Sequence, residues 1–111
     1  MKKQILFVDD MKQVYDKIRN CLGEVFDYAS TEEEGLRKIN ERDYNLVVTD
    51  YDLEDASHNG GLRIIKAAEE KGLVSMLIST ENHKKEALDA GANGFMFKKD
   101  FLEIFGQDGR E

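Results

Sequence analysis

Short apolar segments that alternate with longer amphipathic segments are the feature that most constrains the fold of this chain. The apolar runs cover residues 4–8, 26–29, 46–49, 74–78 and 94–97, and the run at 26–29 is the weakest. Most of the others are nearly continuous, as expected for strands that helices cover on both faces. The pattern therefore predicts a doubly wound α/β fold, in which a five-stranded parallel sheet lies between helices.

The segments between the apolar runs carry helix signals. The second helix can begin at a capping box, formed either by Thr31 with Glu34 or by Ser30 with Glu33. Because residues 79–98 must hold a helix and a strand, we expect a short fourth helix, and the fifth is also expected to be short.

Length and charge narrow the class of protein. The chain has 111 residues and a net charge of −7. We expect one domain over residues 1–105 and a frayed tail over residues 106–111. So acidic a chain is a poor direct ligand for nucleic acid. The single cysteine excludes an intrachain disulfide and favours the cytoplasm, and no apolar run is long enough to enter a membrane.

Polar and charged residues stand at the ends of four of the expected strands. Asp9 and Asp10 follow the first run, Asp50 ends the third, Ser79 follows the fourth and Lys98 follows the fifth. In an open parallel sheet, the carboxyl ends of the strands form the edge where sites lie. Each residue alone could be a helix cap or a surface group, but together they predict one site.

That combination of groups has a chemical logic. Clustered carboxylates repel one another unless a cation lies among them, and hard oxygen ligands suit Mg²⁺. A lysine and a hydroxyl group can hold phosphate oxygens, and an aspartate between them is a competent nucleophile that forms an acyl phosphate. We therefore expect Asp50 to accept a phosphoryl group in a magnesium-dependent acidic pocket.

The chain resembles the receiver domains of two-component response regulators over nearly its whole length. The stretches that carry the resemblance are Ile5–Asp10, Leu46–Asp50, Leu77–Thr80 and Ala90–Lys98. The resemblance implies a flavodoxin-like sheet with the strand order 2-1-3-4-5. It also implies a sensor histidine kinase or phosphotransfer protein as phosphoryl donor and a downstream protein target.

The resemblance assigns the metal ligands. Asp10 would bind Mg²⁺ directly, Asp9 mostly through water, and Asp50 through its carboxylate. The main-chain carbonyl of Asp52 would be a further ligand. The protein would then be a phosphoacceptor that assists its own phosphorylation and dephosphorylation, and would not be an enzyme in the usual sense.

The resemblance also assigns the residues that respond to phosphorylation. Ser79, preferred over Thr80 because it directly ends the apolar run, would bind the phosphoryl group and move with it. Lys98 would pair with the phosphate. Phe95 stands where the family often has an aromatic switch residue, although an ordinary core ring is an equally good interpretation.

Two departures from the family pattern leave questions open. Receivers usually have proline after the lysine, but here Lys99 follows Lys98. A cis peptide bond without proline costs roughly 3–4 kcal/mol, so we expect a trans bond and a less firmly placed lysine. The loop 51–61 is long and acidic. It is either a harmless insertion or a segment that alters metal binding or hydrolysis.

Two other functions compete with the phosphoacceptor. The first is an interaction module that keeps the receiver fold without phosphorylation. The second is a phosphatase of the haloacid dehalogenase type, because Asp50-Tyr51-Asp52 after an apolar strand is similar to its Asp-x-Asp signature. The small size of the chain and the order of its acidic residues disfavour the phosphatase.

Overall fold

The computed structural model describes residues 4–22, 26–53 and 59–105. The predicted frayed tail, residues 106–111, lies outside the described residues, as does the middle of the acidic loop, residues 54–58.

The described residues form a parallel sheet of five strands in the order β2-β1-β3-β4-β5, as predicted. The strands are β1 (Ile5–Val8), β2 (Phe26–Ala29), β3 (Leu46–Asp50), β4 (Val74–Ser79) and β5 (Gly94–Phe97). Each lies within one or two residues of the predicted apolar run. The register pairs the carboxyl end of β1 with that of β3, because Val8 lies opposite Thr49.

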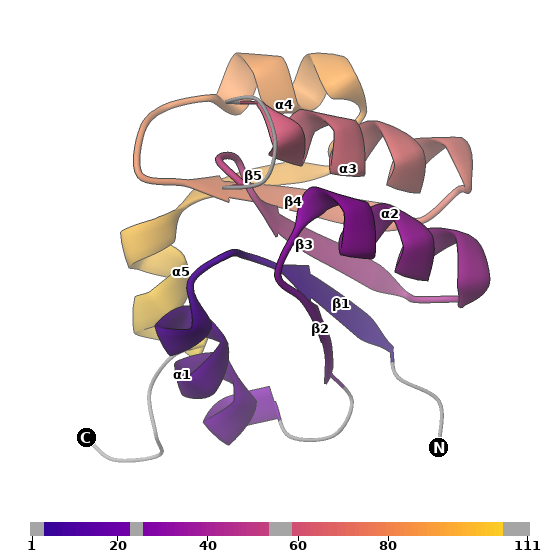
Figure 1. Ribbon diagram of the computed structural model, residues 1–111. Helices are drawn as coiled ribbons and strands as arrows, with labels where there is room; N and C mark the ends of the chain where they lie inside the picture. The colour runs from indigo at the N-terminus through magenta and orange to yellow at the C-terminus, as the bar shows by residue number, and fades with distance from the viewer. Residues whose placement is uncertain (1–3, 23–25, 54–58, 106–111) are drawn as a thin grey trace.

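Helices cover both faces of the sheet. They are α1 (Lys12–Leu22), α2 (Glu32–Glu41), α3 (Gly60–Glu70), α4 (Lys84–Ala90) and α5 (Lys98–Phe105). Figure 1 shows α1 and α5 on one face and α2, α3 and α4 on the other. The fourth and fifth helices have seven and eight residues, which confirms that both are short.

Alternation along the strands builds a core on each face. Leu6 and Val8 pack in the cluster beneath α2 and α3, whereas Phe7 between them packs with residues of α1 and α5. The ring of Phe7 stacks on that of Phe101 in α5, with centroids 5.9 Å apart and planes 2° apart. All three strand residues are completely buried. This near-complete burial of β1 on both faces fixes the position at which the strand ends.

The capping interactions of α2 select one of the two predicted alternatives. The Thr31 hydroxyl accepts a hydrogen bond from the Glu34 amide at 3.0 Å. In return, the Glu34 carboxylate accepts one from the Ser30 amide, also at 3.0 Å. The box therefore uses Thr31 and Glu34, and its return bond reaches one residue further back than the usual pattern.

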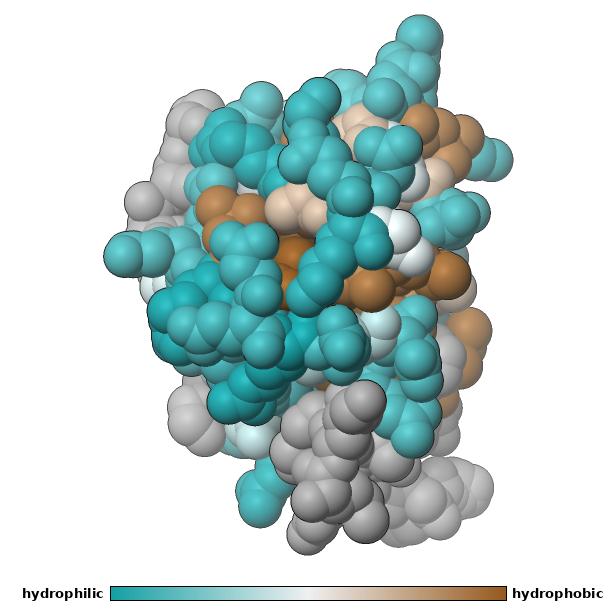
Figure 2. Space-filling view, turned by 90° about the vertical axis from the view of Figure 1, so that its right-hand side faces the viewer, coloured by the Kyte–Doolittle hydropathy of each residue, from teal (hydrophilic) through white to brown (hydrophobic). Residues whose placement is uncertain are grey.

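The edge of the sheet at which the strands begin differs in its side chains from the edge at which they end. Figure 2 looks onto the edge where the strands begin, and there hydrophilic side chains surround a band of apolar ones. Val74, the first residue of β4, keeps half of its surface exposed. No helix in the described part of the chain has the length and apolar content needed to cross a lipid bilayer. The charged residues discussed below lie at the opposite edge, where the strands end.

Candidate functional site

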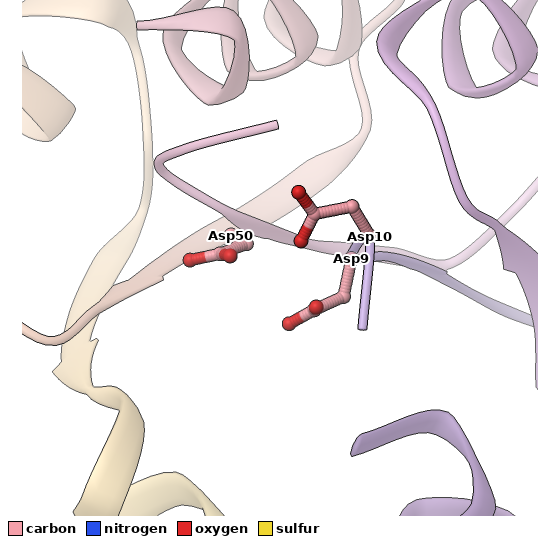
Figure 3. A group of neighbouring side chains, drawn as sticks. All are labelled: Asp9, Asp10 and Asp50. Carbon is pink, nitrogen blue, oxygen red and sulfur yellow. The ribbon is translucent and has the colours of Figure 1, made fainter. Parts of the chain in front are cut away.

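The ends of β1 and β3 bring three carboxylates together. Asp9 and Asp10 directly follow β1, and Asp50 is the last residue of β3. Each offers an oxygen atom that lies within 4.8 Å of the others, and Figure 3 shows the three side chains at one edge of the sheet. Asp9 is completely buried and Asp50 nearly so, while Asp10 is half-buried. The predicted convergence of these side chains is therefore present in the fold.

Lys98 carries the positive charge of this edge. It is the first residue of α5 and directly follows the last residue of β5. Its Nζ atom lies 3.0 Å from an oxygen of Asp9 and 3.0 Å from an oxygen of Asp50. The Lys98 side chain is buried and takes part in both ion pairs. Lys99, not proline, follows it. No peptide bond between described residues is cis. The bond after Lys98 is therefore trans, as expected, and the looser placement of the lysine stays a prediction.

The electrostatics of the cluster follow from burial. One ammonium group among three carboxylates leaves an excess of negative charge away from water. Burial, with repulsion from Asp9, raises the pKa of Asp50 to about 7, and burial also raises the pKa of Asp9. Burial lowers the pKa of Lys98, but attraction to Asp50 and Asp9 outweighs it and leaves that pKa raised. The lysine therefore stays charged at neutral pH.

The segment after β1 is fixed by contacts on both sides of Asp10. The Asp9 amide donates to the Ala29 carbonyl at 3.1 Å. The Asp9 carboxylate accepts a hydrogen bond from the Met11 amide at 2.8 Å. The Tyr28 hydroxyl donates to the main-chain carbonyl of Asp9 at 2.6 Å. Burial raises the pKa of Tyr28 to about 12, so this hydroxyl remains a donor at neutral pH.

The remaining predicted site residues lie around this centre. Ser79 ends β4 and is buried, and its hydroxyl accepts a hydrogen bond from the Glu81 amide at 3.1 Å. The register sets Ser79 beside Phe97, the residue before Lys98. Thr80, the alternative hydroxyl, is exposed. Phe95 is partly buried against the α3–α4 side of the sheet, and its ring meets that of Phe97 edge to face at 5.3 Å.

The start of α3 packs directly on the end of the acceptor strand. The Gly61 amide donates to the Tyr51 carbonyl at 2.9 Å. A Cβ atom at Gly61 would lie 2.0 Å from the carbonyl oxygen of Asp50. Asp52 lies exposed in the segment just after β3, and the use of its carbonyl as a ligand stays a prediction.

Sequence reasoning missed Gly61 and Tyr28. The glycine pair after the acidic loop was a usable signal, because paired glycines after a strand often mark a close approach of the backbone. Tyr28 gave no signal, since an aromatic residue in a strand is ordinary.

The residues present fit a hard divalent cation. Mg²⁺ binds carboxylate oxygens and usually retains several waters. Asp9, Asp10 and Asp50 provide such oxygens within reach of one another. The partial exposure of Asp10 leaves a side from which water can complete the shell. A second positive charge there would offset the excess negative charge that raises the pKa of Asp50.

Comparisons with known proteins identify the family and the fold of the chain. The sequence model of the family described as response regulator receiver domain matches residues 5–104. None of the curated proteins matches the chain. Among solved structures, a CheY-like receiver domain protein from Methanospirillum hungatei is 27% identical, with a TM-score of 0.76, and the match covers 94% of this chain and 90% of that one.

Two further structures share the fold at lower identity. A two-component response regulator from Clostridium difficile is 24% identical, with a TM-score of 0.79 and coverage of 93% of this chain and 88% of that one. A response regulator from Burkholderia pseudomallei, whose structure contains a phosphorylated aspartic acid and a calcium ion, is 17% identical. Its TM-score is 0.77, and the match covers 96% of this chain and 67% of that one.

Proposed function

Since this chain belongs to the response regulator receiver domain family, we propose that it relays a signal by accepting a phosphoryl group on Asp50. The observation that carries the proposal is the position of the Asp50 carboxylate. It ends a buried strand, lies in reach of two further carboxylates and is 3.0 Å from a buried lysine. The donor would be the phosphohistidine of a sensor kinase or of a phosphotransfer protein.

In the proposed reaction, an oxygen of the ionised Asp50 carboxylate attacks phosphorus, and the bond from phosphorus to the donor nitrogen breaks. The product is an acyl phosphate on Asp50 and a donor nitrogen that takes up a proton. A bound Mg²⁺ would neutralise charge on the phosphoryl oxygens during transfer. Asp9, Asp10 and Asp50 would hold that ion by their side chains, with the Asp52 carbonyl as a further ligand.

Two residues of the chain would receive the transferred group. Lys98 already lies 3.0 Å from an Asp50 oxygen, so its ammonium group can pair with a phosphate oxygen without entering the site from solvent. The Ser79 hydroxyl is buried at the end of the neighbouring strand and can donate to another phosphate oxygen once it turns away from the Glu81 amide. This movement of Ser79, with a change at Phe95, would be the switch.

The test is direct phosphorylation by a small acyl-phosphate donor in the presence of Mg²⁺, followed by the mass of the intact protein. We expect an adduct of one phosphoryl group in the unaltered chain and none in Asp50→Asn. Asp43→Asn is the matched control, because the Asp43 side chain is 79% exposed and is not part of the site. It should form the adduct as the unaltered chain does.

The same experiment separates the competing functions. A folded chain that binds Mg²⁺ and never forms the adduct would instead be a phosphorylation-independent interaction module. The family match leaves the haloacid-dehalogenase-like phosphatase without support. We further propose that the receiver unit ends near residue 105, that the chain works in the cytoplasm, and that phosphorylation alters its contact with a downstream protein.

A further inference from the structure

Tyr28 lies outside the groups that the family pattern uses, yet its hydroxyl contacts the acidic segment directly. It belongs to β2, the strand next to β1 at the edge of the sheet. A carbonyl oxygen only accepts hydrogen bonds, so the 2.6 Å contact with the Asp9 carbonyl has one direction, from the phenol to the main chain. The hydroxyl adds no charge to a site that already has an excess of carboxylates.

The ring that carries this hydroxyl is itself held in place. The ring of Tyr15, from α1, lies against it with centroids 4.2 Å apart and planes 36° apart. Both tyrosines pack against the core cluster on the α1–α5 side of the sheet. The phenol is therefore oriented by packing before any ligand arrives.

The contact between Tyr28 and the Asp9 carbonyl bears on the orientation of the next residue, Asp10. The carbonyl of Asp9 is one end of the peptide unit that leads into Asp10. The Asp9 amide is bound to the Ala29 carbonyl, and the Met11 amide is bound to the Asp9 carboxylate. With the carbonyl also bound to Tyr28, the residues on both sides of Asp10 are fixed. The main chain that carries Asp10 then sets the direction of its Cα–Cβ bond, from which the carboxylate extends.

We propose that Tyr28 is a positioning residue for the metal site, and that its hydroxyl holds the Asp9–Asp10 peptide unit in the orientation from which Asp10 binds Mg²⁺. The inference rests on the proposed function. Groups that orient metal ligands typically alter metal affinity by 10- to 100-fold when removed. Because Tyr28 orients one ligand and leaves the other carboxylates in place, we expect Tyr28→Phe to weaken Mg²⁺ binding about tenfold.

Tyr44 offers a matched control in the same chain. Tyr44 is buried, and its hydroxyl donates to the Asp27 carboxylate at 2.7 Å. It precedes β3 and therefore lies at the opposite end of that strand from Asp50. Tyr44→Phe therefore removes one hydroxyl and one hydrogen bond, as Tyr28→Phe does. Urea unfolding of the two variants shows whether their losses of stability are comparable.

The experiment titrates the metal-free full chain with MgCl₂ and follows the amide signals of residues near the acidic edge by NMR. We expect saturable binding in the unaltered chain, the same affinity in Tyr44→Phe and about tenfold weaker binding in Tyr28→Phe. Raising Mg²⁺ to saturation should restore acyl-phosphate labelling of Tyr28→Phe. Because Mg²⁺ binding also stabilises a loosened fold, the recovery is compared with Tyr44→Phe, which should be labelled at the same Mg²⁺ concentration as the unaltered chain.

Each other result decides against the inference. Equal affinity in Tyr28→Phe and the unaltered chain would overturn it and leave the proposed function intact. A similar loss of affinity in Tyr44→Phe would assign the effect to general loosening of the fold. Failure of Tyr28→Phe to fold would make the hydroxyl a requirement of the fold rather than of the site. Absence of saturable binding in the unaltered chain would remove the metal site itself.

Discussion

In the absence of metal, the Asp50→Asn variant should be more stable than the unaltered chain, and the difference in stability should grow as the pH rises. The pKa of Asp50 is raised from 3.8 to about 7 because its carboxyl is buried beside Asp9. A carboxyl with a raised pKa holds a proton in the folded chain that it has already lost in the unfolded chain. Between these two values, stability therefore falls as the pH rises.

The magnitude follows from the same pKa values. Each pKa unit corresponds to about 1.36 kcal/mol, so a rise from 3.8 to about 7 makes ionisation of Asp50 cost about 4 kcal/mol in the folded chain. The penalty is absent below pH 3.8 and complete above about pH 7. About 1.5 kcal/mol of it is already present near pH 5, so roughly 2–3 kcal/mol develops between about pH 5 and pH 9.

The assay is urea unfolding of the unaltered chain and of Asp50→Asn, in a metal chelator, at several values of pH. The difference between the two free energies of unfolding reports the titration of Asp50 together with its coupling to Asp9 and Lys98, and the groups not coupled to Asp50 cancel. Between about pH 5 and pH 9, the free energy of unfolding of Asp50→Asn should increase by roughly 2–3 kcal/mol relative to that of the unaltered chain. Asp43→Asn, which alters an exposed carboxylate, should show no comparable trend. A difference that stays constant with pH, or shifts the other way, would refute the reasoning.

Three further predictions concern the surroundings of Asp50. Gly61→Ala should lower the free energy of unfolding in urea by about 2–3 kcal/mol, because its Cβ would lie 2.0 Å from the Asp50 carbonyl oxygen. Gly94→Ala is the control, since a Cβ there meets nothing within 4 Å, and equal effects of the two substitutions would contradict the close approach. The Mg²⁺ affinity measured by calorimetry should increase as the pH is raised through about 7, because the metal must displace the proton on Asp50. An affinity that does not depend on pH would contradict this prediction. Lys98→Met should raise the pKa of Asp50 in a carbon-detected NMR titration, because the nearest cation is removed. An unchanged pKa would show that the ion pair is not formed in solution.

The sheet and the position of the acidic edge followed from the sequence because both depend on local patterns. Continuous apolar runs indicate buried parallel strands, and the residue after each run must lie at the carboxyl edge. The strand order came from the family resemblance instead, since hydrophobic periodicity carries no information on which strands are neighbours.

The finer features of the site depend on contacts between distant segments, which periodicity does not encode. The partners of Lys98 lie 48 and 89 positions earlier in the chain. The absence of proline after Lys98 is a local signal, and it carries no information on these partners. The role of Tyr28 likewise depends on how far its hydroxyl reaches across β1, a quantity set by sheet twist and packing.

The aromatic stack between β1 and α5 holds the backbone that carries Lys98 close to the backbone that leads into Asp9. Phe7 lies two residues before Asp9, and Phe101 lies three residues after Lys98, on the same side of the first turn of α5. The stack of Phe7 on Phe101 and the ion pair of Asp9 with Lys98 therefore close a small ring of contacts with the two backbone segments as its sides. The start of α5 therefore cannot move away from the end of β1 unless the stack also opens. Part of the entropy cost of aligning the cation is met when the chain folds, before any phosphoryl group would arrive.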